Sequence, residues 1–265
     1  MTPERPLVLV GAGRMGGALL EGWLAAGTDP RAVVVVEPSP PDTQPLRTPG
    51  LTVVAAPPEV AAGTIVLAVK PQVMKDVLPM VAPMRREDTL VVSVAAGITV
   101  ATLGSLGPGP VVRAMPNTPA AIGKGMTAAF AAGASEEEIR LADALLSAAG
   151  AVAWLEEEAL IDAATAVSGS GPAYVFHLVE ALAAAGEAEG LPADVAATLA
   201  RQTIVGAGAL LERSTLDPGT LRRNVTSPGG TTAAALSVLM ETGALTDLMT
   251  MAVHAAAVRS RELGS

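Results

Sequence analysis

Residues 7–26 place a glycine-rich turn between two segments with different local preferences. Residues 7–10 form a short apolar run, and residues 17–26 are rich in Ala and Leu, so the stretch predicts a strand, a turn and a helix. The turn reads Gly-Ala-Gly-Arg-Met-Gly, which has the G-x-G-x-x-G spacing of a dinucleotide-binding loop in the context that this motif requires. We therefore expect an α/β fold that opens with a dinucleotide-binding unit.

Each glycine of this loop has its own expected role. Gly11 would make the tight turn, Gly13 would let the backbone approach a pyrophosphate, and Gly16 would let the helix pack closely on the strand. The phosphates would lie on the N–H groups of the helix that begins near Arg14. The alternative is a turn of small residues without a ligand, in a chain that contains 27 glycines.

The first 155 residues predict a Rossmann-type, mostly parallel sheet. Continuous apolar runs bounded by turn residues are typical of buried parallel strands, and further runs cover residues 32–36, 51–54, 64–69, 90–94, 111–114, 126–130 and 151–155. Helices are expected at residues 58–62, from Pro71 onward, and at 136–149 after a capping box that begins at Ser135.

Glu37 ends the second predicted strand, where a Rossmann carboxylate binds the adenosine ribose and favours NAD over NADP. Ser39, Arg47 and Arg14 could instead hold a 2′-phosphate, or Glu37 could only mark the end of the strand. Other strands end in small or polar residues, namely Lys70, Ala96, Gly97 and Asn117. Ligands of open α/β sheets bind at the carboxyl ends of strands, so these residues should lie around the same crevice as the Gly loop.

From residue 156 onward the sequence predicts only helices, so we expect domains at 1–155 and 156–265. The helices should span residues 156–186, 193–212, 216–224 and 232–263. They are apolar on more than one face, which favours burial in a homo-oligomer. Two stretches stand out. Residues 168–174, SGSGPAY, would form either a helix-packing notch or a place where a ligand approaches, and residues 224–232, NVTSPGGTT, would form either an anion nest or an N-cap.

Composition excludes several classes of function. A net charge of −9 argues against nucleic-acid binding, and no apolar run is long enough to span a bilayer. The absence of Cys and of an export signal indicates the cytoplasm, and two His residues predict no metal site.

Proton donors are scarce as well. No Lys follows Lys124, and hydroxyl and backbone donors suit reduction of an already protonated imine better than reduction of a ketone. A β-hydroxyacid dehydrogenase of the same plan, or a dinucleotide-binding protein without catalysis, is the alternative.

The motifs VGAGRMGGAL, LAVKPQ, VSVAAGIT, VRAMPNTPA, SGSGPAYVF and NVTSPGGTT occur in an order and spacing that resemble pyrroline-5-carboxylate reductase. The resemblance covers nearly the whole chain. It implies reduction of 1-pyrroline-5-carboxylate to L-proline with NADPH or NADH, an N-terminal Rossmann domain, and a C-terminal all-helical dimerisation domain whose dimers often assemble into decamers.

The resemblance also implies roles for individual residues. On the cofactor side it places Ala12, Arg14 and Met15 on the pyrophosphate, Ser39 and Pro40 near the ribose, and Val69, Lys70, Pro71 and Ala96 along the nicotinamide half. On the substrate side it implies Glu158, Asn224, Thr231 and Thr232 in the pocket, with Ser227, Gly229 and Gly230 shaping the carboxylate nest. The resemblance makes Thr232 the candidate catalytic residue, which would hydrogen-bond and orient the ring nitrogen and could also donate a proton to it. Many members of the family have a smaller residue where Glu37 stands, so the usual NADPH preference is open here.

Overall fold

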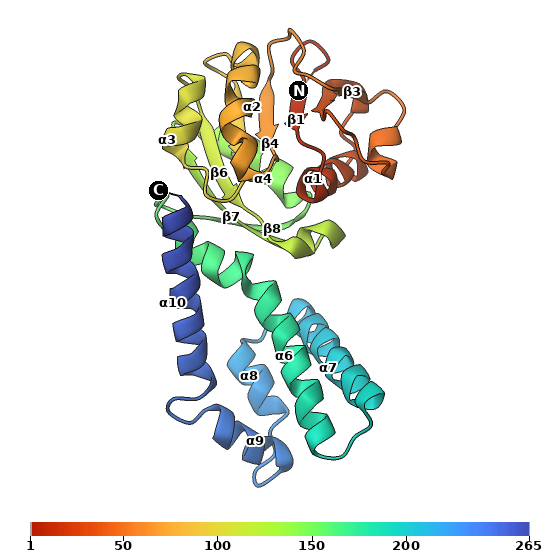
Figure 1. The fold of residues 1–265 in the computed structure, drawn as a ribbon, viewed down its shortest axis with the longest axis vertical. Helices are drawn as coiled ribbons and strands as arrows, with labels where there is room; N and C mark the ends of the chain where they lie inside the picture. The colour runs from red at the N-terminus through yellow and green to blue at the C-terminus, as the bar shows by residue number, and fades with distance from the viewer. Residues whose placement is uncertain (1, 265) are drawn as a thin grey trace. The chain divides into compact units, whose positions relative to one another are not determined.

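The computed structural model describes residues 2–264, and they divide into two compact units (Figure 1). The first comprises the chain up to Gly169 together with residues from Ala256 on, and the second comprises Ser170–Ala255. The first compact unit extends 14 residues beyond the domain boundary expected at residue 155, and it also includes the residues from Ala256 on. The boundary at residue 155 stays a prediction.

One eight-stranded sheet forms the centre of the first unit, in the order β3-β2-β1-β4-β5-β6-β7-β8. Its strands are β1 (Leu7–Val10), β2 (Val33–Val36), β3 (Thr52–Val54), β4 (Thr64–Leu67), β5 (Leu90–Ser93), β6 (Val111–Met115), β7 (Gly125–Ala132) and β8 (Gly150–Trp154). All neighbours pair in parallel except β6 and β7, where Arg113 lies opposite Phe130. The predicted mostly parallel Rossmann-type sheet is therefore confirmed.

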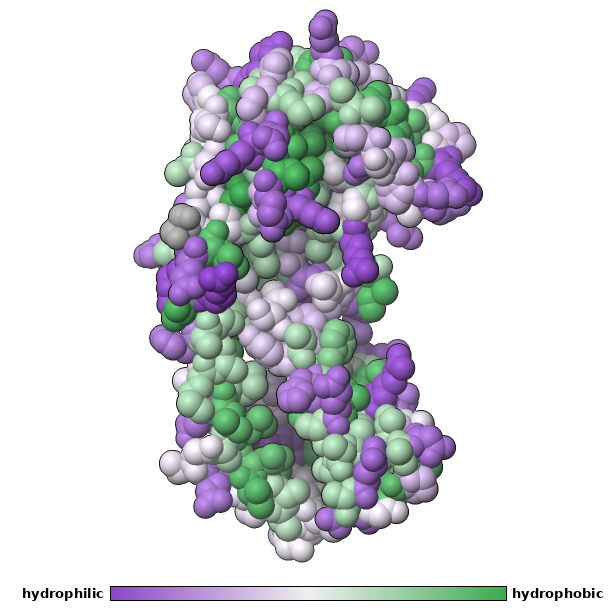
Figure 2. Space-filling model, in the orientation of Figure 1, coloured by the Kyte–Doolittle hydropathy of each residue, from purple (hydrophilic) through white to green (hydrophobic). Residues whose placement is uncertain are grey.

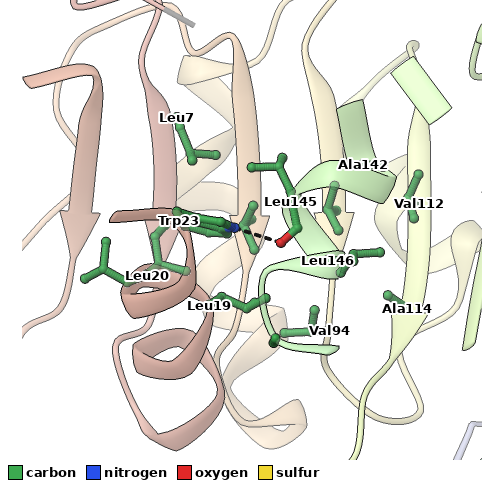
Figure 3. Packing of buried hydrophobic residues seen from close by; sticks show 14 of the residues in the cluster. Leu7, Leu19, Leu20, Trp23, Val94, Val112, Ala114, Ala142, Leu145 and Leu146 are labelled. Atoms are coloured by element: carbon green, nitrogen blue, oxygen red, sulfur yellow. Dashed lines mark hydrogen bonds between the residues drawn. The ribbon is translucent and has the colours of Figure 1, made fainter. Parts of the chain in front are cut away.

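Alternate residues of each strand pack against helices on opposite faces of the sheet. Leu7 and Leu9 of β1 belong to a cluster with α1 (Arg14–Ala25) and α4 (Glu136–Ser147), whereas Val8 and Val10 pack with α2 (Met74–Val81) and α3 (Val100–Leu103). Trp23 of α1 is buried between sheet and α4 and donates its indole N–H to the Leu145 carbonyl at 2.8 Å (Figure 3).

The capping box at the start of α4 is confirmed. The Ser135 hydroxyl accepts from the Glu138 N–H at 3.3 Å, and the Glu138 carboxylate accepts from the Ser135 N–H at 2.7 Å. The helix predicted at residues 58–62 is wrong, because the backbone there bends without helical hydrogen bonds. Ala62 instead donates its N–H to the Met84 carbonyl and accepts from the buried Thr89 hydroxyl.

The remaining helices are α5 (Leu160–Ala164), α6 (Gly171–Ala188), α7 (Ala193–Arg213), α8 (Pro218–Asn224), α9 (Thr231–Leu239) and α10 (Leu245–Leu263). Two of the predicted helices are broken. Residues 156–186 contain a π-helical turn at Thr165–Gly169 between α5 and α6, and residues 232–263 are interrupted before α10 by Gly243, whose φ is +83°. None of the helices in the described part of the chain has the length and apolar character that a membrane crossing requires.

Candidate active site

The Gly loop joins β1 to α1, and its three glycines meet three different surroundings. Gly11 has φ +93°, and a Cβ there would lie 2.9 Å from the Ala68 carbonyl oxygen. A Cβ at Gly16 would lie 2.1 Å from the Gly11 carbonyl oxygen, so turn and helix approach each other as closely as glycine permits. A Cβ at Gly13 would meet no atom within 4 Å. The first and third glycines thus close the loop, and the second faces open space.

The first turn of α1 has features that favour the binding of an anion. Gly13 is the N-cap residue and has no side chain to bond the first-turn N–H groups, and no acidic side chain lies in that turn. Uncapped N–H groups and the positive end of the helix dipole attract phosphate. Ala12 is buried, whereas Arg14 is exposed and Met15 half-buried beside this turn. The loop therefore has the free N–H donors and the open approach that a pyrophosphate needs.

Glu37 directly follows β2 and contacts the Gly loop. One carboxylate oxygen accepts the Ala12 N–H at 2.9 Å, and the other accepts the Ser39 N–H at 3.1 Å. The predicted ribose carboxylate thus lies beside the loop, as expected for a residue at the carboxyl end of the neighbouring strand. Pro40 is exposed in the same segment.

The ends of β4, β5 and β6 add the other cofactor residues predicted at this edge of the sheet. Val69, Lys70 and Pro71 follow β4, and Lys70 is exposed. Ala96 and Gly97 follow β5, where Gly97 has φ +73° and lies against the Leu263 carbonyl of α10. The parallel register of β1, β2, β4, β5 and β6 brings these turns to one edge.

Asn117, at the end of β6, holds the π-helical turn. Its side-chain amide donates to the Ser168 carbonyl at 3.1 Å and hydroxyl at 3.2 Å, and its oxygen accepts the Met126 N–H at 2.8 Å. In a regular helix the Ser168 carbonyl would accept from residue 172, which is Pro172 and has no N–H. Asn117 therefore supplies a donor to the Ser168 carbonyl that Pro172 cannot supply.

Glu158 makes two contacts with the same oxygen. It accepts from the Arg113 guanidinium at 2.8 Å and from the Val100 N–H at 2.8 Å. The Arg113 side chain is 7% exposed, so Glu158 neutralises a charge buried in the sheet. Glu158 also accepts the N–H of Val100, the first residue of α3, whose N-cap is Thr99. Arg113 was missed at the sequence level, although an arginine inside the apolar run VVRAM is itself a signal of a buried partner.

The remaining predicted substrate residues lie in the second unit, around the start of α9. Gly229 has φ +71°, and Gly230 is the N-cap residue of α9, again without a side-chain cap. The Gly230 N–H donates to the Ser227 carbonyl at 3.0 Å, so the turn is closed on itself. Thr232 is half-buried, whereas Asn224 and Thr231 are exposed. The predicted nest therefore presents free first-turn N–H groups beside two threonine hydroxyls.

Two family models match the chain. Residues 6–97 match an NADP oxidoreductase, coenzyme F420-dependent, and residues 158–263 match the pyrroline-5-carboxylate reductase dimerisation domain. The second match supports a homo-oligomer. Nowhere in residues 2–264 do three or more His, Asp or Glu side chains gather as a metal site would need.

Relatives cover nearly the whole chain. A pyrroline-5-carboxylate reductase from Pseudomonas aeruginosa is 42% identical over 97% of this chain and 96% of its own, and one from Pisum sativum is 40% identical over 97% and 95%. The solved reductase from Coxiella burnetii has a TM-score of 0.90 at 34% identity, over 99% of both chains. That from Plasmodium falciparum, solved with NADP bound, has a TM-score of 0.80 at 29% identity over 100% of both. The chain belongs to the pyrroline-5-carboxylate reductase family.

Proposed function

We propose that this chain reduces 1-pyrroline-5-carboxylate to L-proline by hydride transfer from NADPH or NADH. The observation that carries this conclusion is the identity of about 40% with pyrroline-5-carboxylate reductases over 97% of the chain. The open Gly loop at the start of α1 supports it, because a phosphate-bearing dinucleotide fits such a loop.

The first unit would hold the cofactor. The Gly11, Gly13 and Gly16 backbone would bind the pyrophosphate with Ala12, Arg14 and Met15. The turns after β4, β5 and β6 would line the nicotinamide half, with Val69, Lys70, Pro71, Ala96, Gly97 and Asn117. The nicotinamide supplies the hydride. The protein residues hold the cofactor and the substrate in the orientation that the reaction requires. Reactants that are already oriented lose less entropy on the way to the transition state.

Glu158 would hold the loop after β5 in place, and with it the residues that line the nicotinamide half of the cofactor site. Its bond to the Val100 N–H fixes the start of α3, four residues after Ala96, and Arg113 holds the carboxylate in place. A direct contact between Glu158 and the substrate stays a prediction. Its present bonds support a role in holding the loop that bears Ala96 and Gly97.

The start of α9 would bind the substrate carboxylate. Ser227, Gly229 and Gly230 shape the turn, and the uncapped N–H groups of Thr231 and Thr232 would donate to the anion. The Thr232 hydroxyl would bond the ring nitrogen, with Asn224 nearby in sequence. Because an imine nitrogen can arrive protonated, Thr232 needs to orient the ring and not to act as a strong acid.

The test is coupled oxidation of NADH or NADPH when the pyrroline is added. We expect turnover with at least one cofactor, and a loss of roughly tenfold or more in kcat/KM for Thr232→Ala, with cofactor affinity unchanged. Thr232→Ser keeps the hydroxyl and should retain most activity. A folded protein that binds both cofactors but never oxidises them with the pyrroline would refute the proposal, and oxidation of 3-hydroxy acids instead would point to the dehydrogenase alternative.

We further propose a homodimer that assembles into a decamer in the cytoplasm. In residues 170–255, all of which the structure describes, only Ala196 and Ala200 are buried. Large apolar side chains lie at the surface of this unit, among them Phe176 and Leu210 at 63% and 64% exposure. The space-filling view also shows hydrophobic residues at the surface of this unit (Figure 2). Burial of that surface would stabilise association. Light scattering after size exclusion distinguishes decamer, dimer and monomer, and cell fractionation tests the location.

A further inference from the structure

The choice between NADH and NADPH depends on the adenosine ribose, which differs only by the 2′-phosphate. In this fold the ribose lies at the end of β2, beside the Gly loop. The end of β2 carries Glu37, so the chemistry around its carboxylate decides which cofactor the first unit accepts.

The position of Glu37 is set by the sheet. Its own N–H donates to the Val54 carbonyl at 2.9 Å, and the carbonyl of the preceding Val36 accepts the Gly11 N–H at 2.9 Å. The backbone of the turn is thus tied both to β3 and to the Gly loop. Glu37 is only half-exposed, whereas Ser39 and Pro40 after it are exposed.

The carboxylate is held by two backbone donors. Ala12 and Ser39 each donate an N–H to a different oxygen, at 2.9 and 3.1 Å. An ionised carboxylate offers about four acceptor positions, so about two remain for other donors. Two ribose hydroxyls would satisfy them, whereas a 2′-phosphate offers only acceptors and negative charge.

The groups that could hold a 2′-phosphate have other partners or lie in solvent. The N–H of Ser39 is used by Glu37, and Arg47 forms an ion pair with Asp42. Arg14 is exposed in the first turn of α1, where its charge would have to offset Glu37 to favour the phosphate. The negative charge of Glu37 therefore disfavours a 2′-phosphate beside its carboxylate.

We propose that Glu37 makes this enzyme prefer NADH, by accepting hydrogen bonds from the ribose hydroxyls and repelling a 2′-phosphate. The proposal rests on the proposed dinucleotide site in the first unit. It assigns the choice of cofactor to one side chain, and it concerns binding, so it can be tested without the pyrroline.

The first experiment measures the affinity of the full-length protein for ADP-ribose and for its 2′-phosphate by calorimetry. We expect the unphosphorylated ligand to bind at least about tenfold more tightly, which is about 1.4 kcal/mol. In Glu37→Ser the ratio of the affinity for ADP-ribose to that for its 2′-phosphate should fall by about tenfold or more. The main cause should be tighter binding of the 2′-phosphorylated ligand. Glu59→Gln, which removes an exposed charge elsewhere in the first unit, should leave the ratio unchanged.

The second experiment compares kcat/KM for NADH and NADPH with the pyrroline. The wild-type enzyme should favour NADH, and Glu37→Ser should shift the ratio toward NADPH in parallel with the binding data. A wild-type preference for NADPH, or an equal ratio in wild type and Glu37→Ser, overturns the proposal. If the ligands are discriminated but the pyrroline is not reduced, the proposed function fails and the role of Glu37 stands.

Discussion

Replacement of Trp23 by Phe tests how the first unit holds the helix that carries the Gly loop. Trp23 lies in the core between α1 and α4, and its indole N–H donates to the Leu145 carbonyl at 2.8 Å (Figure 3). That carbonyl belongs to the last turn of α4, where helix carbonyls lack intrahelical partners. The indole is thus both apolar filling and a C-terminal partner for α4.

The expected cost has two parts. Phe buries about 40 Å² less apolar surface, which at roughly 25 cal/mol per Å² is about 1 kcal/mol. The Leu145 carbonyl, left in the core without its donor, adds about 1–3 kcal/mol. We therefore expect Trp23→Phe to lower the free energy of unfolding by about 2–4 kcal/mol, or the urea midpoint by roughly 1–2 M.

Trp154→Phe is the matched control. Its indole also donates one hydrogen bond, to the Asp143 carboxylate at 2.8 Å, but both side chains are half-buried and water can replace the bond. Its cost should stay below about 1 kcal/mol. Unfolding is followed by far-UV circular dichroism at one protein concentration, because an oligomer's stability depends on concentration. Equal costs for the two variants would refute the reasoning.

Three further predictions concern charge and capping. The buried Arg85 guanidinium has no hydrogen-bond partner in the described structure and burial lowers its pKa, so Arg85→Met should leave thermal stability unchanged or raise it. The hydrogen bond from the Arg5 guanidinium lowers the pKa of Asp88 below its usual 3.8. This pair therefore stabilises the fold above pH 3.8, and its contribution is lost as the pH falls through the lowered pKa. The Tm of Asp88→Asn should lie below that of the wild type by its largest amount at neutral pH, and the difference should shrink in acid. Ser135→Ala removes half of a capping box with Glu138 and should cost about 1 kcal/mol in chemical denaturation, with cofactor affinity unchanged.

The sheet could be predicted because its signal is local. Eight apolar runs matched eight strands, and the glycine spacing located the turn after β1. The helix expected at residues 58–62 was wrong because so short a segment gains little from helical hydrogen bonds, and tertiary bonds from Ala62 to Met84 and Thr89 replace them. Composition alone shows no such distant partners.

In the candidate site, too, the features that depend on local sequence were predicted and the long-range contacts were not. The position of Glu37 beside the loop was predicted from its place at the end of the second strand of a Rossmann-type unit, but its bonds to Ala12 and Ser39 needed coordinates. The pairing of Arg113 with Glu158 joins residues 45 apart, and Asn117 bonds Ser168 across 51 positions. Such pairs depend on how the chain folds back, which periodicity does not report.

The discontinuous make-up of the first unit bears on how the protein is synthesised. Its sheet is complete by Trp154, yet Ser260 bonds Asp162 at 2.6 Å and the Leu263 carbonyl lies against Gly97. On the ribosome, the Gly loop and Glu37 can take their places long before these last residues emerge. The loop after β5 lacks its contact with the Leu263 carbonyl until the last turn of α10 has formed. A nascent chain should therefore acquire the adenosine end of its site early, and the support of Gly97 only after Leu263 has emerged.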